Sequence, residues 1–180
     1  LYNKNFATLA RAVVGLGRPG LGIVHVGEDH DEAIAGALGG APVPLTRLSH
    51  IGDDRLAALY RGALCLCVPS FAEGFCLPVL EAQALDCPVI CSDRSATPEI
   101  AGAGALTFDP ADAAALTACL RRLLDETGLR TALIARGRDN VRRYDWAETA
   151  RRYETLLLDA LRDGATARTA REVPHAHPAP

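Results

Sequence analysis

The sequence predicts an α/β fold built on a parallel, doubly wound sheet. Five short apolar runs alternate with longer segments of helical periodicity, which is the order expected of right-handed β-α-β units. Two of these runs are joined by a loop with a glycine and a carboxylate, followed by a short helix. Ligands bind such sheets beyond the carboxyl ends of the strands. This loop is therefore where we expect a binding site.

Each expected element has a local signal. Strands are predicted where apolar runs lie between glycine, proline or polar residues, at 21–27, 43–48, 63–69, 88–92 and 105–108. His25, inside the first of them, is expected to be a core histidine. Helices are predicted at 3–16, 29–38, 53–62, from 78, from 97, at 111–125, 129–143 and 144–162. Asn3 is expected to cap the first helix, and Asp109 with Pro110 to cap the one that ends near residue 125.

Composition predicts one globular domain of 180 residues with a tail, since 49% of the residues are hydrophobic and the net charge is −3. This balance gives no electrostatic case for nucleic acid or an anionic membrane surface. No apolar stretch approaches the ~20 residues of a spanning helix, and no signal peptide is recognisable. The chain begins at Leu1 and has no methionine, so we expect a domain of a longer product. Residues 164–180 are small, polar and proline-rich, and are predicted to be a disordered tail.

The cysteines are expected to be structural. Their spacing does not fit the paired pattern of zinc sites, and most of them fall in or beside apolar strands, where a thiol behaves as a small hydrophobe. We therefore expect free thiols in a reducing cytoplasm rather than disulfides or metal ligands. There are six: Cys65, Cys67, Cys76, Cys87, Cys91 and Cys119.

The loop and helix after residue 69 have the chemistry of a ligand site. Pro78 suits a first helical position, and the free N–H groups of Val79 and Leu80 would then attract an anion such as a phosphate. Glu73 precedes the helix and Glu81 is expected in its first turn. Two carboxylates beside a phosphate must face other groups, such as hydroxyls, and a sugar nucleotide has both. Acidic residues in a first turn also occur for dipole reasons alone, and spacing leaves both interpretations open.

The segment EGFCLPVLE, from Glu73 to Glu81, resembles the E-x7-E motif of GT4-type glycosyltransferases, usually written EGFGLPxLE. The resemblance continues in DDRLAALY at 53–60, VPS at 68–70, PVICS at 88–92 and PEIAG at 98–102. It implies a Rossmann-like domain over residues 1–163, the C-terminal, nucleotide-sugar-binding half of a GT-B fold, with residues 144–163 as the helix that crosses back to the other half. In that family a further strand precedes the first helix near the centre of the sheet. An incomplete sheet without this first strand is therefore expected.

The resemblance also implies roles for single residues. Lys4, in a YNKNF segment similar to the family's GGYKNF, would contact the donor diphosphate. Without the resemblance, a solvated surface lysine is the favoured interpretation. Glu73 would lie near the hydroxyls and reaction centre of the transferred sugar, and Glu81 would accept the ribose hydroxyls. His50 would stack on the base, although a loop histidine on the surface is the plainer interpretation. Four backbone N–H groups would face the sugar and phosphate: those of Gly74, Phe75, Cys76 and Leu77.

Two residues depart from the family pattern. Cys76 and Asp86 stand where the family usually has glycine. A Cβ at Cys76 would narrow the approach of the backbone to a ligand.

The activity that the resemblance implies is retaining transfer of a sugar from a UDP- or GDP-linked donor, similar to mannosyltransferases, without cofactor or metal. The partner would be an N-terminal acceptor-binding domain or subunit. Without this half the chain would be inactive, and any peripheral membrane association would come through it. One alternative is a non-catalytic nucleotide-binding or partner-binding module from a truncated or split glycosyltransferase. Another is a nucleotide-sugar epimerase of GT-B architecture, which would lack the Glu73 to Glu81 context.

Overall fold

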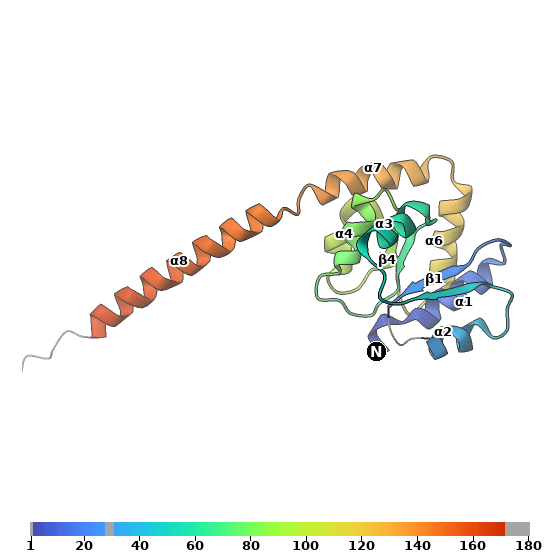
Figure 1. Cartoon of the computed structure of the whole chain (residues 1–180), viewed down its shortest axis with the longest axis horizontal. Coiled ribbons are helices and arrows are strands. Elements are labelled where there is room, and N and C mark those ends of the chain that lie inside the picture. The colour runs from blue at the N-terminus through green and yellow to red at the C-terminus, as the bar shows by residue number, and fades with distance from the viewer. Residues whose placement is uncertain (1, 28–30, 172–180) are drawn as a thin grey trace, which may run out of the picture. The chain divides into compact units, whose positions relative to one another are not determined.

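The computed structural model of the chain describes residues 2–27 and 31–171 (Figure 1). They divide between Arg142 and Arg143 into two compact units. The second unit contains helix α8 (Trp146–Arg171). The first unit contains, in chain order, η1 (Tyr2–Lys4), α1 (Phe6–Leu16), β1 (Ile23–Val26), α2 (Asp31–Leu38), β2 (Leu45–Leu48), α3 (Asp53–Gly62), β3 (Leu66–Val68), α4 (Leu77–Ala84), β4 (Val89–Ser92), α5 (Thr97–Ala101), η2 (Gly102–Gly104), β5 (Ala105–Phe108), α6 (Ala113–Asp125) and α7 (Leu129–Val141).

All described strand pairs are parallel, as the sequence predicts, but the five described strands form two sheets rather than one. β1 pairs with β2, with Ile23 opposite Leu45, and β4 lies between β3 and β5. Among the described residues no pairing joins the two sheets, which confirms the expectation of an incomplete sheet. The strands are shorter than predicted where prolines flank them. Pro44 and Pro69, for example, have no N–H to give to a ladder.

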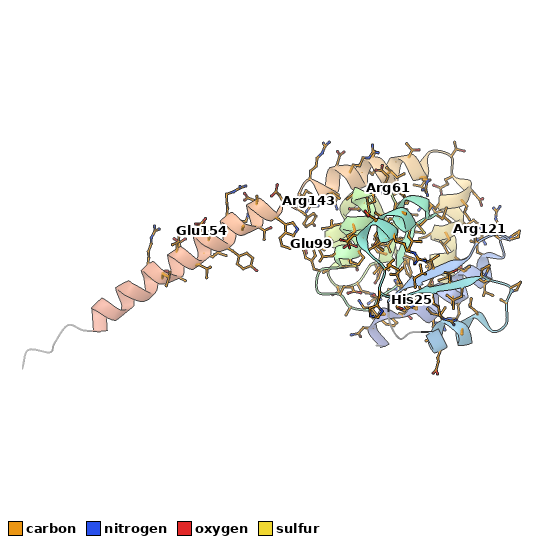
Figure 2. The ribbon with its side chains drawn as sticks, in the orientation of Figure 1. His25, Arg61, Glu99, Arg121, Arg143 and Glu154 are labelled. Carbon is orange, nitrogen blue, oxygen red and sulfur yellow. The ribbon has the colours of Figure 1, made fainter. Side chains whose placement is uncertain are left out.

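Helices cover the strands on both faces. All four residues of β4 are buried, which is typical of a parallel strand packed on two sides. α1 packs against α2 and α6, α6 contacts β4 and β5, and α4 packs against α5, α7 and β3 (Figure 1). His25 of β1 is buried and packs edge-on against Phe6, with ring centroids 4.9 Å apart (Figure 2). The central hydrophobic cluster includes Ile23, Ile34, Ile90, Phe108, Leu116, Leu120 and Leu133.

A buried polar contact fixes α4 against its neighbours. The Gln83 amide of α4 donates to the backbone oxygen of Ala101 (2.9 Å) and accepts a bond from the Asn140 amide of α7 (2.8 Å). A Cβ added at Gly104 would lie 2.6 Å from Gln83 Nε2 and 2.7 Å from the Cα of Gly137. Only glycine allows so close an approach of η2 to α7. The helix that carries Glu81 is thus held from two sides.

The start of α6 differs from the prediction. The N-cap of α6 is Asp112, whose carboxylate accepts from Ala114 N (2.8 Å) and Ala115 N (3.0 Å). Asp109 instead accepts from Ala111 N one turn earlier, so the predicted Asp109–Pro110 cap is wrong. Two acidic residues three apart both suit a turn or a cap, and the sequence does not separate them.

α8 is longer than predicted. Asp145 caps it by accepting from two backbone N–H groups, and the helix continues past residue 162 to Arg171. Residues 164–171, predicted as disordered tail, are therefore helical, and 172–180 lie outside the described residues. Ala and Arg are strong helix formers, which outweighs the low hydrophobicity of the segment. Several of its apolar side chains are exposed, Trp146 at 80%. Within residues 2–27 and 31–171 no helix is long and apolar enough to cross a bilayer.

Candidate functional site

The structure brings together Lys4 and Glu73, which lie 69 residues apart in the chain. Lys4 Nζ lies 2.8 Å from Glu73 Oε1 and 3.1 Å from Oε2. The glutamate side chain is mostly buried, at 14% exposed, whereas the lysine is 46% exposed. Glu73 stands in the loop between β3 and α4, beyond the carboxyl end of β3. The pair therefore occupies the position at which parallel sheets bind ligands.

Lys4 is placed by the residue that follows it. Asn5 has a left-handed backbone (φ 52°) and separates η1 from α1, so the N-cap position is Asn5 and not the predicted Asn3. The Asn5 side chain makes no cap bond. The backbone oxygen of Asn3 instead accepts a bond from Phe71 N at 2.7 Å, which joins η1 to the Glu73 loop. The Asn5 amide donates to two carbonyl oxygens past strand ends: Pro69 (3.0 Å) and Pro110 (2.7 Å).

Glu73 is placed by Ser95, a residue that the sequence analysis did not select. Ser95 Oγ donates to the backbone oxygen of Glu73 at 2.8 Å and accepts from its backbone N at 3.4 Å. Ser95 lies between β4 and α5 and has φ 58°, a conformation that costs about 1–2 kcal/mol for a residue with a Cβ. Strained backbone of this kind occurs at functional sites. A polar residue after a strand was the only signal in the sequence.

The start of α4 differs in detail from the prediction. Leu77 is the first helical residue, Pro78 the second, and Glu81 lies in the second turn and not in the first. Cys76 precedes the helix with φ 78° and ψ 60°. This left-handed turn directs the Cys76 carbonyl back to Val79 N, at 3.1 Å. The Val79 N–H that was expected to face an anion is therefore already bonded.

The pKa of the Cys76 thiol is affected by burial and by nearby charged groups. Burial raises its pKa to about 11, the negative charge of Glu73 adds to this, and Lys4 acts in the opposite direction. Glu81 also contributes to the increase. We use the name α4 entrance for the Lys4–Glu73 ion pair together with Cys76, which precedes α4, and Glu81, which lies on it.

Glu81 has a partner that the sequence analysis missed. Its Oε2 accepts a hydrogen bond from the Tyr60 hydroxyl of α3, at 3.1 Å. Burial of the phenol and the nearby Glu81 charge hold the pKa of Tyr60 well above its usual value. Glu81 is exposed, as is Gly74. Phe75 and Leu77 also show exposed apolar side chains beside the α4 entrance, at 43% and 49%.

His50 and Asp86 occupy other positions. His50 follows β2, in the two-stranded sheet, with φ 52°. Asp86 follows the far end of α4 with φ 60°, and its two oxygens accept from Arg138 of α7, each at 2.6 Å. The Arg138 guanidinium lowers the pKa of this carboxyl. Asp86 thus occupies a turn position at the far end of the helix, whereas Cys76 belongs to the α4 entrance.

The surroundings of the other cysteine thiols indicate a structural role. All six cysteines lie within the described residues and are free. Burial raises the pKa of Cys65 and of Cys91 to about 12 each, so both are neutral at ordinary pH. Across residues 2–27 and 31–171, no group of three His, Cys, Asp or Glu side chains is placed to hold a metal ion.

Comparison with known proteins identifies the family to which the chain is similar. The family model described as "Glycosyl transferases group 1" matches residues 3–140. An O-antigen chain mannosyltransferase B of Escherichia coli is 36% identical over 99 residues, 55% of this chain and 26% of the relative. A phosphatidyl-myo-inositol mannosyltransferase of Mycobacterium leprae (strain TN) is 33% identical over 138 residues. This match covers 73% of this chain and 37% of the relative. The chain thus spans well under half the length of these curated relatives.

Solved structures agree on the fold. A sucrose-phosphate synthase from Thermosynechococcus elongatus superimposes with a TM-score of 0.77 at 25% identity, over 91% of this chain and 44% of that one. The C-terminal domain of a group 1 glycosyl transferase from Francisella tularensis superimposes with a TM-score of 0.67 at 24% identity, over 78% of this chain and 79% of that one. The α/β unit therefore has the Rossmann-like fold of the C-terminal half of a GT-B glycosyltransferase, and the chain belongs to the group 1 glycosyl transferases.

Proposed function

We propose that this chain is the donor-binding half of a retaining glycosyltransferase, which transfers a sugar from a UDP- or GDP-linked donor to an acceptor held by an N-terminal domain or subunit. The observation that carries the proposal is the ion pair of Lys4 with Glu73, which lies beyond the carboxyl end of β3 in the loop that leads into the helix of Glu81. The names of the relatives favour mannose as the sugar. Buried free thiols favour a reducing compartment, the cytoplasm.

Each charged group of the α4 entrance has a role in this proposal. Lys4 binds the diphosphate and offsets the charge that develops on the leaving group. Its ion pair with Glu73 is half exposed on the lysine side, so sharing the ammonium with a phosphate costs no more than about 1 kcal/mol. Glu73, held by Ser95, faces the sugar hydroxyls and the reaction centre. Glu81 accepts the ribose hydroxyls. The backbone of Gly74, Phe75, Cys76 and Leu77 lines the sugar and phosphate, and His50 approaches the base.

The proposed reaction needs no group beyond donor and acceptor. The bond between the anomeric carbon and the phosphate oxygen breaks, and the acceptor oxygen bonds to the same face of that carbon. The acceptor proton passes to the departing phosphate oxygen. Lys4 and nearby N–H groups stabilise the nucleoside diphosphate, and in this proposal no metal ion is required.

Donor binding is the test of this proposal. We expect that one of the UDP-, GDP- or ADP-sugars raises the unfolding midpoint of the full-length protein. At a hundredfold excess over Kd the stabilisation is about 2.7 kcal/mol, a shift of several degrees. Lys4→Ala and Glu81→Ala should each weaken binding about tenfold or more, since each removes a charge-assisted contact. The matched control is Glu154→Ala, which changes an exposed glutamate of α8 (Figure 2) and should leave binding unchanged.

Binding and transfer are separated by Glu73→Gln. This variant should keep the Kd of the donor within about threefold and lower the rate of sugar transfer at least tenfold, because the carboxylate acts at the sugar and not on the nucleotide. If no nucleotide sugar stabilises the full-length protein, the donor-site assignment is wrong. If Glu81→Ala binds as tightly as the parent, its ribose role is wrong.

A further inference from the structure

Tyr60 of α3 forms a side-chain hydrogen bond with Glu81. It lies in the last turn of α3, and its hydroxyl donates to Glu81 Oε2 at 3.1 Å across 21 residues of chain. The phenol stays protonated at any ordinary pH because burial and the Glu81 charge both raise its pKa. Tyr60 is therefore a permanent donor toward one oxygen of this carboxylate.

Glu81 has no orienting partner on its own helix. On an α-helix the side chains that can meet residue 81 lie three and four positions away. In α4 and at its C-cap, these positions are apolar or small: Leu77, Pro78, Ala84 and the C-cap residue Leu85. An exposed glutamate without a charged helical neighbour samples several rotamers, and fixing one has an entropic cost. The bond from Tyr60 to Oε2 restricts the rotamer of the carboxylate.

We propose that Tyr60 is a positioning residue that holds the Glu81 carboxylate in the orientation that accepts the ribose hydroxyls, so that discrimination of ribose from deoxyribose depends on Tyr60. This inference rests on the ribose role of Glu81 in the proposed function. A bidentate contact between a carboxylate and a diol requires both oxygens in one plane at hydrogen-bond distance. A donor bound to one carboxylate oxygen restricts this plane, and each carboxylate oxygen can accept a second hydrogen bond.

Tyr60→Phe removes one hydroxyl and leaves the ring in place, so it isolates this bond. The measurement is the ratio of two dissociation constants of the full-length protein, obtained by calorimetry with UDP and its 2′-deoxy form, and with GDP and its 2′-deoxy form. For the parent we expect the deoxy nucleotide to bind at least about tenfold more weakly, the loss of one charge-assisted hydrogen bond. In Tyr60→Phe this ratio should fall about fivefold, with Kd of the deoxy form unchanged within about twofold.

The double variant Tyr60→Phe/Glu81→Ala tests whether Tyr60 acts through Glu81. The ratio of deoxy to ribo dissociation constants in the double variant should equal the ratio in Glu81→Ala alone, because a positioning residue has no effect once its target is absent. The matched control is Tyr153→Phe, which alters an exposed tyrosine of α8 and should keep the parent ratio. A ratio is insensitive to the fraction of folded protein, since both ligands see the same sample.

Three results would overturn the inference. If Tyr60→Phe weakens the ribo and deoxy forms equally, Tyr60 has a structural role only. If Glu81→Ala abolishes discrimination and Tyr60→Phe keeps it, the proposed function stands and Tyr60 has no part in it. If the parent does not discriminate at all, the ribose role of Glu81 fails first, and the inference fails with it.

Discussion

Gly104→Ala should destabilise the α/β unit by about 3 kcal/mol. The added Cβ would lie 2.6 Å from Gln83 Nε2 and 2.8 Å from the backbone N of Gly137, so both side chain and backbone must move. Overpacking of this kind costs about 1–3 kcal/mol. Displacing the Gln83 amide from Ala101 O leaves a buried polar group without its partner, at about 1–3 kcal/mol more.

Urea unfolding of the full-length protein, followed by circular dichroism, measures this change. With a slope near 2 kcal/mol/M, a loss of about 3 kcal/mol lowers the midpoint by about 1.5 M. The matched control is Gly36→Ala in α2, where an added Cβ meets nothing within 4 Å. It should stabilise by up to about 1 kcal/mol, because alanine favours helix. Both substitutions lower the conformational entropy of the unfolded chain in the same way, so the difference between their midpoints reports on the folded state. If their midpoints agree within error, the close approach of η2 to α7 is not as described.

Three further predictions concern the site, pH and a helix end. Cys76→Gly should be about 1 kcal/mol more stable than Cys76→Ala by urea unfolding, because only glycine relieves the left-handed backbone; equal stability would mean that position 76 is unstrained. The thiols of Cys65 and Cys91 have pKa values raised to about 12 by burial, above the ordinary 9.0, so stability is full below pH 9 and decreases as pH rises toward 12. Urea midpoints at pH 7.5, 9 and 10.5 should show this fall, and it should be shallower in Cys65→Ala. Asp112→Ala should cost about 1 kcal/mol by losing the α6 cap, whereas an unchanged midpoint would refute that cap.

The fold was largely predictable because its signals are local. Apolar runs and helical periodicity located the strands and helices of the first unit, and α3 begins and ends at the predicted residues 53 and 62. The ends were less predictable where two residues could serve the same purpose, as Asp109 and Asp112 could before α6. The tail prediction was wrong over 164–171 because low hydrophobicity says little about an alanine- and arginine-rich helix.

At the proposed site, sequence reasoning selected the charged residues but not the residues that form hydrogen bonds with them. Lys4 and Glu73 were predicted to share a site, and they form an ion pair. Ser95 and Tyr60 lie 22 and 21 residues from the glutamates that they contact, and no local pattern marks such pairs. Hydrogen bonds between loops depend on how strand ends meet in space, which periodicity does not encode.

Hydrogen–deuterium exchange on the full-length protein, with and without a saturating nucleotide sugar, tests the central claim most directly. Exchange reports opening of each segment, and a bound ligand slows it where it contacts the chain. We predict slower exchange in peptides that cover η1 and residues 71–81, and unchanged exchange in α6. Protection confined to α6, or the same protection in Lys4→Ala at an equal donor concentration near Kd, would contradict the assignment of the α4 entrance as the donor site.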